Sequence, residues 1–232
     1  MPFDPLLLHP YTLVRSQRKS VAIYITRDAQ VEVRAPLHTP VHAIERFVAS
    51  KKTWIDTRLG MREKVRDEKA AFSLHYGSML LLQGHEYPIE AREGKHSGFD
   101  GVCFYMPPDL SAMEIKAEVI RIYKLVAKQI ISEKVEFYAK ELHVVPARVR
   151  ISSAKTRWGS CSGKKNLNFS WRLMMAEDTV IDYIVVHELA HILELNHSSR
   201  FWAHVERILP DYRSSNAKLK QLQEMLSFQD WD

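Results

Sequence analysis

The stretch that organises the chain is Val185-Val186-His187-Glu188-Leu189-Ala190-His191-Ile192-Leu193-Glu194-Leu195-Asn196-His197. Its order His-Glu-x-x-His sets His187 and His191 four residues apart, and side chains at that spacing point from the same face of a helix. Two imidazoles on one face can hold one zinc ion, and Glu188 beside them can act as a base on the water that the metal activates. The flanking residues are apolar, so the pattern predicts a buried helix whose polar groups require partners or a metal.

The third histidine, His197, follows His191 by six residues. On an ideal helix it would lie roughly 240° around the axis from His191 and point away from the metal. The sequence therefore predicts a break near Asn196, a residue type that tolerates the left-handed conformation at helix ends. Three protein ligands are typical of a catalytic zinc, whereas a structural site takes four. Cys161 is the alternative fourth ligand, but nothing in its spacing supports that role.

The composition of the 232 residues, 46% hydrophobic and 26% charged, is typical of a soluble globular protein. No apolar run reaches the length of a transmembrane helix, and the N-terminus lacks a signal-peptide pattern. The two cysteines, Cys103 and Cys161, indicate reduced thiols in a cytoplasm and exclude a disulfide framework. The net charge of +5 favours acidic partners such as nucleic acid or phosphorylated substrates, or simply a solvated basic surface.

The first half of the chain, residues 1–106, is predicted to be a β-rich domain or extension with one helix. Pro107-Pro108 then breaks the chain before a long helical pattern, so we place the domain boundary between residues 106 and 107. The predicted elements are strands within 11–35 around a turn at 27–30, a helix from 39 to 55, a charged linker or exposed helix end at 61–69, strands at 78–83 and 86–92 around Gly84-His85, and a strand at 102–106.

The second half, residues 107–232, is predicted to place helices around a small sheet, which makes the fold class α+β. Ser111 and Glu114 match a capping box and open a helix that continues to about Leu142. The other predicted elements are strands at 149–151 and 166–171 around a loop at 155–165, the helix of His187 and His191 from Asp178 or Thr179, and shorter helices at 199–208 and 214–227.

The motifs between residues 155 and 203 resemble the YgjP-like family of predicted zinc metallopeptidases, which is related to the SprT-like proteins. They are KTRWGSCS at 155–162, LNF at 167–169, WRL at 171–173, DYIVVHELAH at 182–191, NHS at 196–198 and FW at 201–202. The likeness is dense over residues 110–213, and the N-terminal half fits the family's β-containing extension more loosely. Two departures, at 175–178 and at Ser170, concern the end of a strand rather than the ligands.

The resemblance implies a minimal zincin-like core in which a small sheet packs on the H-E-x-x-H helix. It also implies one Zn²⁺ ion per chain, held by His187, His191 and His197, with Glu188 as the catalytic acid/base.

A basic cluster in and beyond the loop from Lys155 to Ser162 is the candidate substrate contact. It can bind a carboxylate or a phosphate beside the metal, or it can be a solvated loop with Trp158 packed in the core. The candidate substrate-binding residues are Lys155, Arg157, Ser160 and Arg172.

The function predicted from these residues is that of a zinc-dependent metallohydrolase, first of all a metallopeptidase with Glu188 as general base. A first alternative, implied by the family resemblance, is a metal-dependent nucleotide pyrophosphatase of the UTP type, with phosphates bound by the loop 155–162. A second is a nucleic-acid-associated SprT-like protease, although no zinc-finger cysteine pairs support it. The expected substrates are thus peptides, proteins or nucleoside triphosphates, acted on in the cytoplasm and away from membranes; the sequence predicts no oligomeric state.

Overall fold

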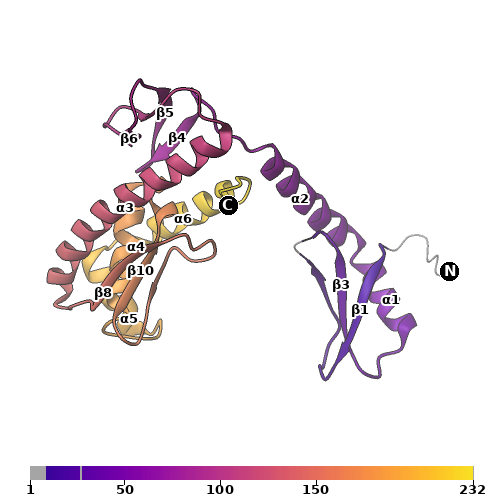
Figure 1. The fold of residues 1–232 in the computed structure, drawn as a ribbon. Coiled ribbons are helices and arrows are strands. Elements are labelled where there is room, and N and C mark those ends of the chain that lie inside the picture. Colours follow the sequence, from indigo (N-terminus) through magenta and orange to yellow (C-terminus); the bar gives the residue numbers. More distant parts are fainter. Residues whose placement is uncertain (1–8, 27, 232) are drawn as a thin grey trace. The chain divides into compact units, whose positions relative to one another are not determined.

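The computed structural model describes residues 9–26 and 28–231, and Figure 1 shows its helices and strands. They are β1 (Tyr11–Ser16), β2 (Ala22–Ile25), β3 (Val31–Pro36), α1 (Val41–Ser50), α2 (Lys52–Ala71), β4 (Met79–Leu82), β5 (His85–Ala91), β6 (Gly98–Phe99), β7 (Phe104–Met106), α3 (Ala112–Leu142), β8 (Arg148–Ser152), β9 (Gly159–Cys161), β10 (Asn166–Ser170), the 3₁₀ helix η2 (Trp171–Met175), α4 (Asp178–Ala190), α5 (Ser199–Ile208) and α6 (Tyr212–Leu226). The predicted α+β class is confirmed. Of the helices in the described ranges, none combines the length and apolar character that crossing a bilayer requires.

Two compact units make up the chain: the first comprises the residues up to Phe72 together with Ser227–Asp230, and the second comprises Ser73–Leu226 with Trp231. The predicted boundary at 106/107 therefore falls inside the second unit. The physical reason is that β4 and β5, which precede that boundary, are fastened to elements that follow it. The Tyr123 hydroxyl of α3 donates to the carbonyl of Leu81, and the amide of Gln83 donates to the carbonyl of Met174 at 2.7 Å.

The first unit packs a three-stranded sheet, in the order β1-β3-β2, against α1 and α2. The central strand β3 runs parallel to β1 and antiparallel to β2. Alternate residues of β3 point into the core, as expected for a strand with one covered face. The core residues are Val31, Val33, Ala35, Ile44, Val48 and Ile55.

The helical part of the first unit differs from the single helix that was predicted. The backbone leaves helical geometry at Lys51, where φ is −108° and ψ is 13°, and this separates α1 from α2. The charged stretch 61–69 belongs to α2, so it is an exposed helix end and not a linker. Its strong helix formers keep it helical without a core to pack on. The turn predicted at 27–30 includes residue 27, which lies outside the described residues.

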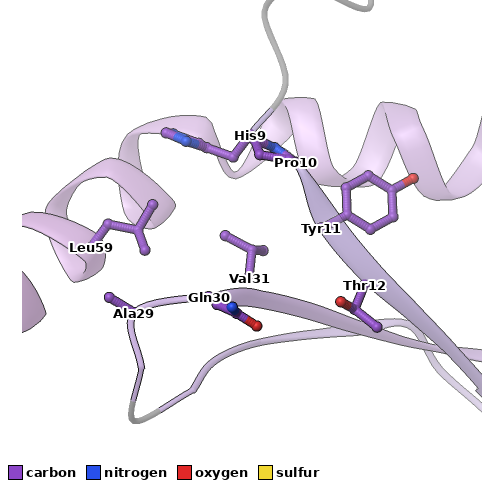
Figure 2. Close-up of a pocket in the computed structure, with 8 residues that line it drawn as sticks. All are labelled: His9, Pro10, Tyr11, Thr12, Ala29, Gln30, Val31 and Leu59. Carbon is purple, nitrogen blue, oxygen red and sulfur yellow. The ribbon is translucent and has the colours of Figure 1, made fainter.

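A surface pocket of about 380 Å³ lies in the first unit, where β1 and β3 approach α2 (Figure 2). His9 is its only imidazole, and Nε2 of that ring contacts the Asp56 carboxylate. None of the predicted site residues lines the pocket.

The second unit begins with a four-stranded sheet in the order β4-β5-β7-β6. The hairpin between β4 and β5 turns at Gln83 and Gly84, whose φ values of 50° and 80° are both left-handed, as two-residue hairpins of the primed type require. A side chain at Gly84 would also meet Cγ of Glu177 at 2.7 Å, so this turn docks closely before α4.

The rest of the second unit is the small sheet and the helices that surround the H-E-x-x-H motif. The predicted capping box of Ser111 and Glu114 starts α3, and His143 ends it in the left-handed conformation. The sheet has the order β8-β10-β9, with β8 parallel and β9 antiparallel to β10. Helix α4 packs against α3, α5, α6 and β9. The predicted arrangement of a small sheet on the H-E-x-x-H helix is therefore confirmed, but β9 lies within a segment that was predicted to be a loop.

Candidate metal centre

Helix α4 supplies the first two histidines and the glutamate from a buried position. Nine of its 13 residues are buried, and a helix that is apolar on nearly every side is one that other elements enclose. His187 and Glu188 lie in its last turn, and His191 follows its last residue, Ala190. The enclosing elements hold the backbone of these side chains rigidly in place.

The break that recruits the third histidine occurs earlier than predicted. The helix ends at Ala190, and tighter turns follow, in which the amides of Ile192 and Leu193 donate to the carbonyls three residues before them, each at 3.0 Å. Asn196 is not among the described residues with positive φ, so the expectation of a left-handed break at Asn196 is wrong. The chain therefore changes direction gradually, over successive turns closed by hydrogen bonds to the residue three positions earlier, and not at a single residue.

The three predicted ligands, His187, His191 and His197, come together. Their candidate ligand atoms all lie within 4.8 Å of one another. Nε2 of His197 lies 3.0 Å from Nε2 of His187. Nδ1 of His191 lies 3.1 Å from the Glu194 carbonyl oxygen, which can only accept, so this nitrogen carries the proton and Nε2 is left with its lone pair.

The chemistry of this donor set fits a zinc ion. Burial, and then the neighbouring His191 and His197, lower the pKa of His187 to about 3, and burial also lowers the pKa of His191. Both rings are thus neutral near pH 7, the form that binds metal. Zinc binds imidazole nitrogen at roughly 2.0–2.1 Å, so two nitrogens of a tetrahedral site lie roughly 3.3 Å apart, which is near the 3.0 Å between the two facing Nε2 atoms. Nδ1 of His187 is buried and has no hydrogen-bond partner among the described residues.

An aromatic platform of Phe201, Trp202 and Tyr212 supports the histidines. The fully buried ring of Phe201 contacts all three imidazoles, with centroids 4.9, 4.5 and 4.8 Å from those of His187, His191 and His197. Trp202 stacks on His197 at 5.7 Å, and Tyr212 stacks on Trp202 at 5.1 Å. The platform restricts rotation of the rings. The sequence signal was the Phe-Trp pair four residues after His197, to which we assigned no role.

Glu188 is enclosed beside the histidines, with 6% of its surface exposed. Burial raises the pKa of its carboxyl to about 7. Strand β9 lies directly against it, because a Cβ atom at Gly159 would come within 2.6 Å of both Cγ and Oε1 of Glu188. Burial and the charge of Glu188 also raise the pKa of the Cys161 thiol on the same strand. A carboxyl that titrates near neutrality is suited to accept and return a proton.

Strand β9 ends the sheet order, so no described strand pairs with its outer side. The amide of Ser170 donates to the carbonyl of Trp158, and the amide of Ser162 donates to the carbonyl of Asn166, each at 2.9 Å. One hydrogen-bonded pair with the β10 segment therefore lies just before β9 and another just after it. Because such pairs alternate in an antiparallel ladder, the backbone groups of Gly159 and Cys161 point away from β10. Sequence reasoning missed this strand. Its sole signal was Gly163, which lies in the turn between the short segments that form β9 and β10.

The predicted substrate-binding residues are placed differently from one another. Lys155 and Arg157 are exposed in the segment before β9, and Ser160 is half-buried on β9 opposite Asn168.

Arg172, the fourth of these residues, is buried. Its guanidinium donates to the carbonyls of Ser153 and Trp231, each at 3.1 Å, and lies over the ring of Trp171. This placement favours a structural role for Arg172, tying the segment before β9 to the C-terminal residues.

Comparison with known proteins gives one family and two solved structures. The family model described as "YgjP-like, metallopeptidase domain" matches residues 19–222. The crystal structure of the metallopeptidase zymogen abylysin from Pyrococcus abyssi is similar at 26% identity and a TM-score of 0.37, over 41% of this chain and 94% of that one. The zymogen jannalysin from Methanocaldococcus jannaschii is similar at 23% identity and a TM-score of 0.36, over 41% and 96%. No curated protein matches the sequence.

Proposed function

The chain belongs to the YgjP-like metallopeptidase family, and we propose that it is a zinc-dependent peptidase in which Glu188 is the general base. The observation that carries the proposal is the buried carboxyl of Glu188, which follows His187 of the three-histidine cluster in α4 and packs against Gly159 of the edge strand β9. That position joins a proton acceptor, a metal-binding donor set and a surface that can pair with an extended chain.

His187, His191 and His197 would hold the zinc, which when bound polarises a scissile carbonyl and makes water more acidic. The protein's part in proton transfer falls to Glu188. Its carboxylate accepts the proton of the attacking water, and a pKa of about 7 lets the same group return the proton to the leaving nitrogen. The Glu194 carbonyl and the ring of Phe201 keep His191 in one orientation while this occurs.

The free edge of β9 favours a peptide as the substrate. An extended peptide can add to an exposed sheet edge through main-chain hydrogen bonds, and Gly159 and Cys161 offer their amide and carbonyl groups there. Gly159 also adjoins the Glu188 carboxyl, so a peptide bound at this point would have a bond next to the base. Contacts to the backbone alone would give broad sequence tolerance.

The nucleotide pyrophosphatase remains a second candidate because Lys155 and Arg157 are exposed in the segment that leads into β9. Phosphate recognition would require these cations, since the guanidinium of Arg172 is engaged by backbone carbonyls. A SprT-like action on proteins bound to nucleic acid would use the same peptidase centre.

The test compares the wild type with Glu188→Gln on a denatured fluorescent casein and on a panel of nucleoside triphosphates. We expect casein cleavage by the zinc-loaded wild type and a roughly 10²–10⁴-fold loss in Glu188→Gln, because a positioned general base contributes that much. Zinc content, measured by mass spectrometry, should not change.

The matched control is Glu206→Gln, which makes the same substitution at an exposed carboxylate of α5 and should keep full activity. Pyrophosphate release without casein cleavage, lost in Lys155→Gln/Arg157→Gln, would replace the peptidase by the nucleotide hydrolase. Undiminished cleavage by Glu188→Gln would remove the general-base assignment.

A further inference from the structure

The formal charge of the chain is distributed unevenly along its length. Residues 1–72 hold 13 Lys or Arg and 8 Asp or Glu, whereas residues 73–232 hold 20 of each. The net charge of +5 is therefore carried entirely by the first range. The proposed peptidase chemistry does not explain this asymmetry, because all of its residues belong to the second range.

Helix α2 holds six Lys or Arg and four Asp or Glu, so it contributes +2 to this net charge, and it has little core to cover it. Ile55 is the only buried residue among its 20, and Figure 1 shows its C-terminal half continuing beyond the three-stranded sheet. Trp54, Arg58, Arg62 and Arg66 follow one another at steps of four residues, so they lie along one side of the helix. All four are exposed, Trp54 by 42%. We call these four residues the arginine stripe.

Three of the four acidic residues of α2 follow a separate line, and Glu68 is the fourth. Asp56, Glu63 and Asp67 are seven and four residues apart, which places them on another face of the helix. Asp67 pairs with Arg66 at 3.1 Å. Arg58 and Arg62 form no ion pair with any residue that the structure describes, and the Arg58 guanidinium lies over one face of the Trp54 ring, 5.8 Å from its centroid. Like charges four residues apart destabilise a helix, so this arrangement disfavours α2 unless an anion neutralises it.

We propose that the arginine stripe binds single-stranded nucleic acid, with the arginines on phosphates and Trp54 stacked on an unpaired base. Guanidinium groups match phosphate geometry, and an exposed indole offers a flat apolar surface for stacking. The stripe extends about 18 Å along the helix, the length of several nucleotides. An anionic membrane presents the same charge but no planar bases, and a duplex hides its bases within the stack.

The test uses the full chain and a fluorescein-labelled oligodeoxythymidine of 20 nucleotides, with binding followed by anisotropy over a series of salt concentrations. The wild type should bind, with affinity that falls as salt rises. Arg58→Gln/Arg62→Gln/Arg66→Gln should weaken binding at least tenfold and reduce the slope of log affinity against log salt by about 2, because each lost phosphate contact removes about 0.7. Trp54→Ala should weaken binding about tenfold and leave the slope unchanged.

The matched control removes three exposed lysines of the second unit, in Lys124→Gln/Lys128→Gln/Lys220→Gln, and should change affinity less than twofold. Circular dichroism and casein cleavage check that each variant is folded. Four results would overturn the proposal: no saturable binding by the wild type, equal weakening in the control, equal competition by polyglutamate, or binding to phosphatidylserine vesicles without binding to the oligonucleotide.

Discussion

Helix α4 buries nine of its 13 residues, whereas α2 buries one of its 20. Enclosure of α4 raises the pKa of Glu188 to about 7 and lowers that of His187 to about 3, which suits two side chains of the same helix turn to the proposed roles of proton acceptor and neutral ligand. Helix α2 leaves its cations in water, where they act on partners through their field and cause little local chemistry. The comparison teaches that reactivity in this chain requires burial, while recognition of charge requires exposure.

The largest expected contrast between the two helices is in stability. Ile181→Ala, in the fully buried part of α4, should lower the free energy of unfolding by about 2–5 kcal/mol because it leaves a cavity. Met61→Ala, on the exposed side of α2, should change it by less than about 0.5 kcal/mol. Urea denaturation measures both. Similar losses in the two variants would mean that the helices are not supported as differently as their burial indicates.

Substitution of one proposed ligand should weaken zinc binding, whereas substitution of a histidine outside the cluster should not. His197→Ala should weaken zinc binding by more than about 100-fold, because losing a ligand costs more than losing a ligand's hydrogen-bond partner. Competition with a chromophoric chelator measures the affinity. His204→Ala, in α5 but outside the three-histidine cluster, is the control and should bind zinc as the wild type does. Equal affinities in the two variants would remove His197 from the ligand set.

The contact between β9 and Glu188 tests how closely α4 is enclosed. Gly159→Ala should displace the Glu188 side chain, which its new Cβ would otherwise meet at 2.6 Å. We expect roughly 10²-fold less casein cleavage and about 1–3 kcal/mol less stability. Gly163→Ala, in the same hairpin but with nothing within 4 Å of the added carbon, should leave both unchanged. Full activity in Gly159→Ala would show that the strand does not constrain the base.

The smallest expected effect is on the pH dependence of stability, and it concerns Asp100, an exposed carboxyl whose pKa is shifted in the opposite direction to that of the buried Glu188. The amide of Cys103, the guanidinium of Arg92 and the amide of Val102 donate to Asp100 and hold its pKa well below its usual range. Because the pKa is lowered on folding, the resulting stability is present above the ordinary value near 4 and is lost as pH falls below it. Asp100→Asn should flatten the dependence of the melting temperature on pH below 4. An unchanged acid limb in this variant would contradict the assignment.

The parts of the fold that were predicted correctly have local causes. The capping box of Ser111 and Glu114 lies within one helix turn, and the spacing of His187 and His191 follows from helix geometry. The hairpin at Gly84 follows from a backbone conformation that glycine favours. Each of these signals depends on neighbours within a few residues, so periodicity and turn chemistry were sufficient to place them.

The features that were missed depend on distant partners. Strand β9 has three residues and exists because β10 pairs with it and α4 packs against it. The buried guanidinium of Arg172 is explained by the Trp231 carbonyl, 59 residues away in the chain. The division at Phe72 likewise results from contacts between β4, η2 and α3, which the sequence pattern around Pro107 does not reveal.

The sequence by itself determined the candidate ligands, the candidate base and the helix that carries them, because their spacing matches the repeat of an α-helix and zinc chemistry limits which residues can serve. Tertiary structure alone decided where the chain reverses to bring His197 back, which strand presents its edge beside Glu188, and that Phe201 supports all three imidazoles. The reason is that burial, pairing and close approach are properties of segments brought together by folding, and no single segment encodes them.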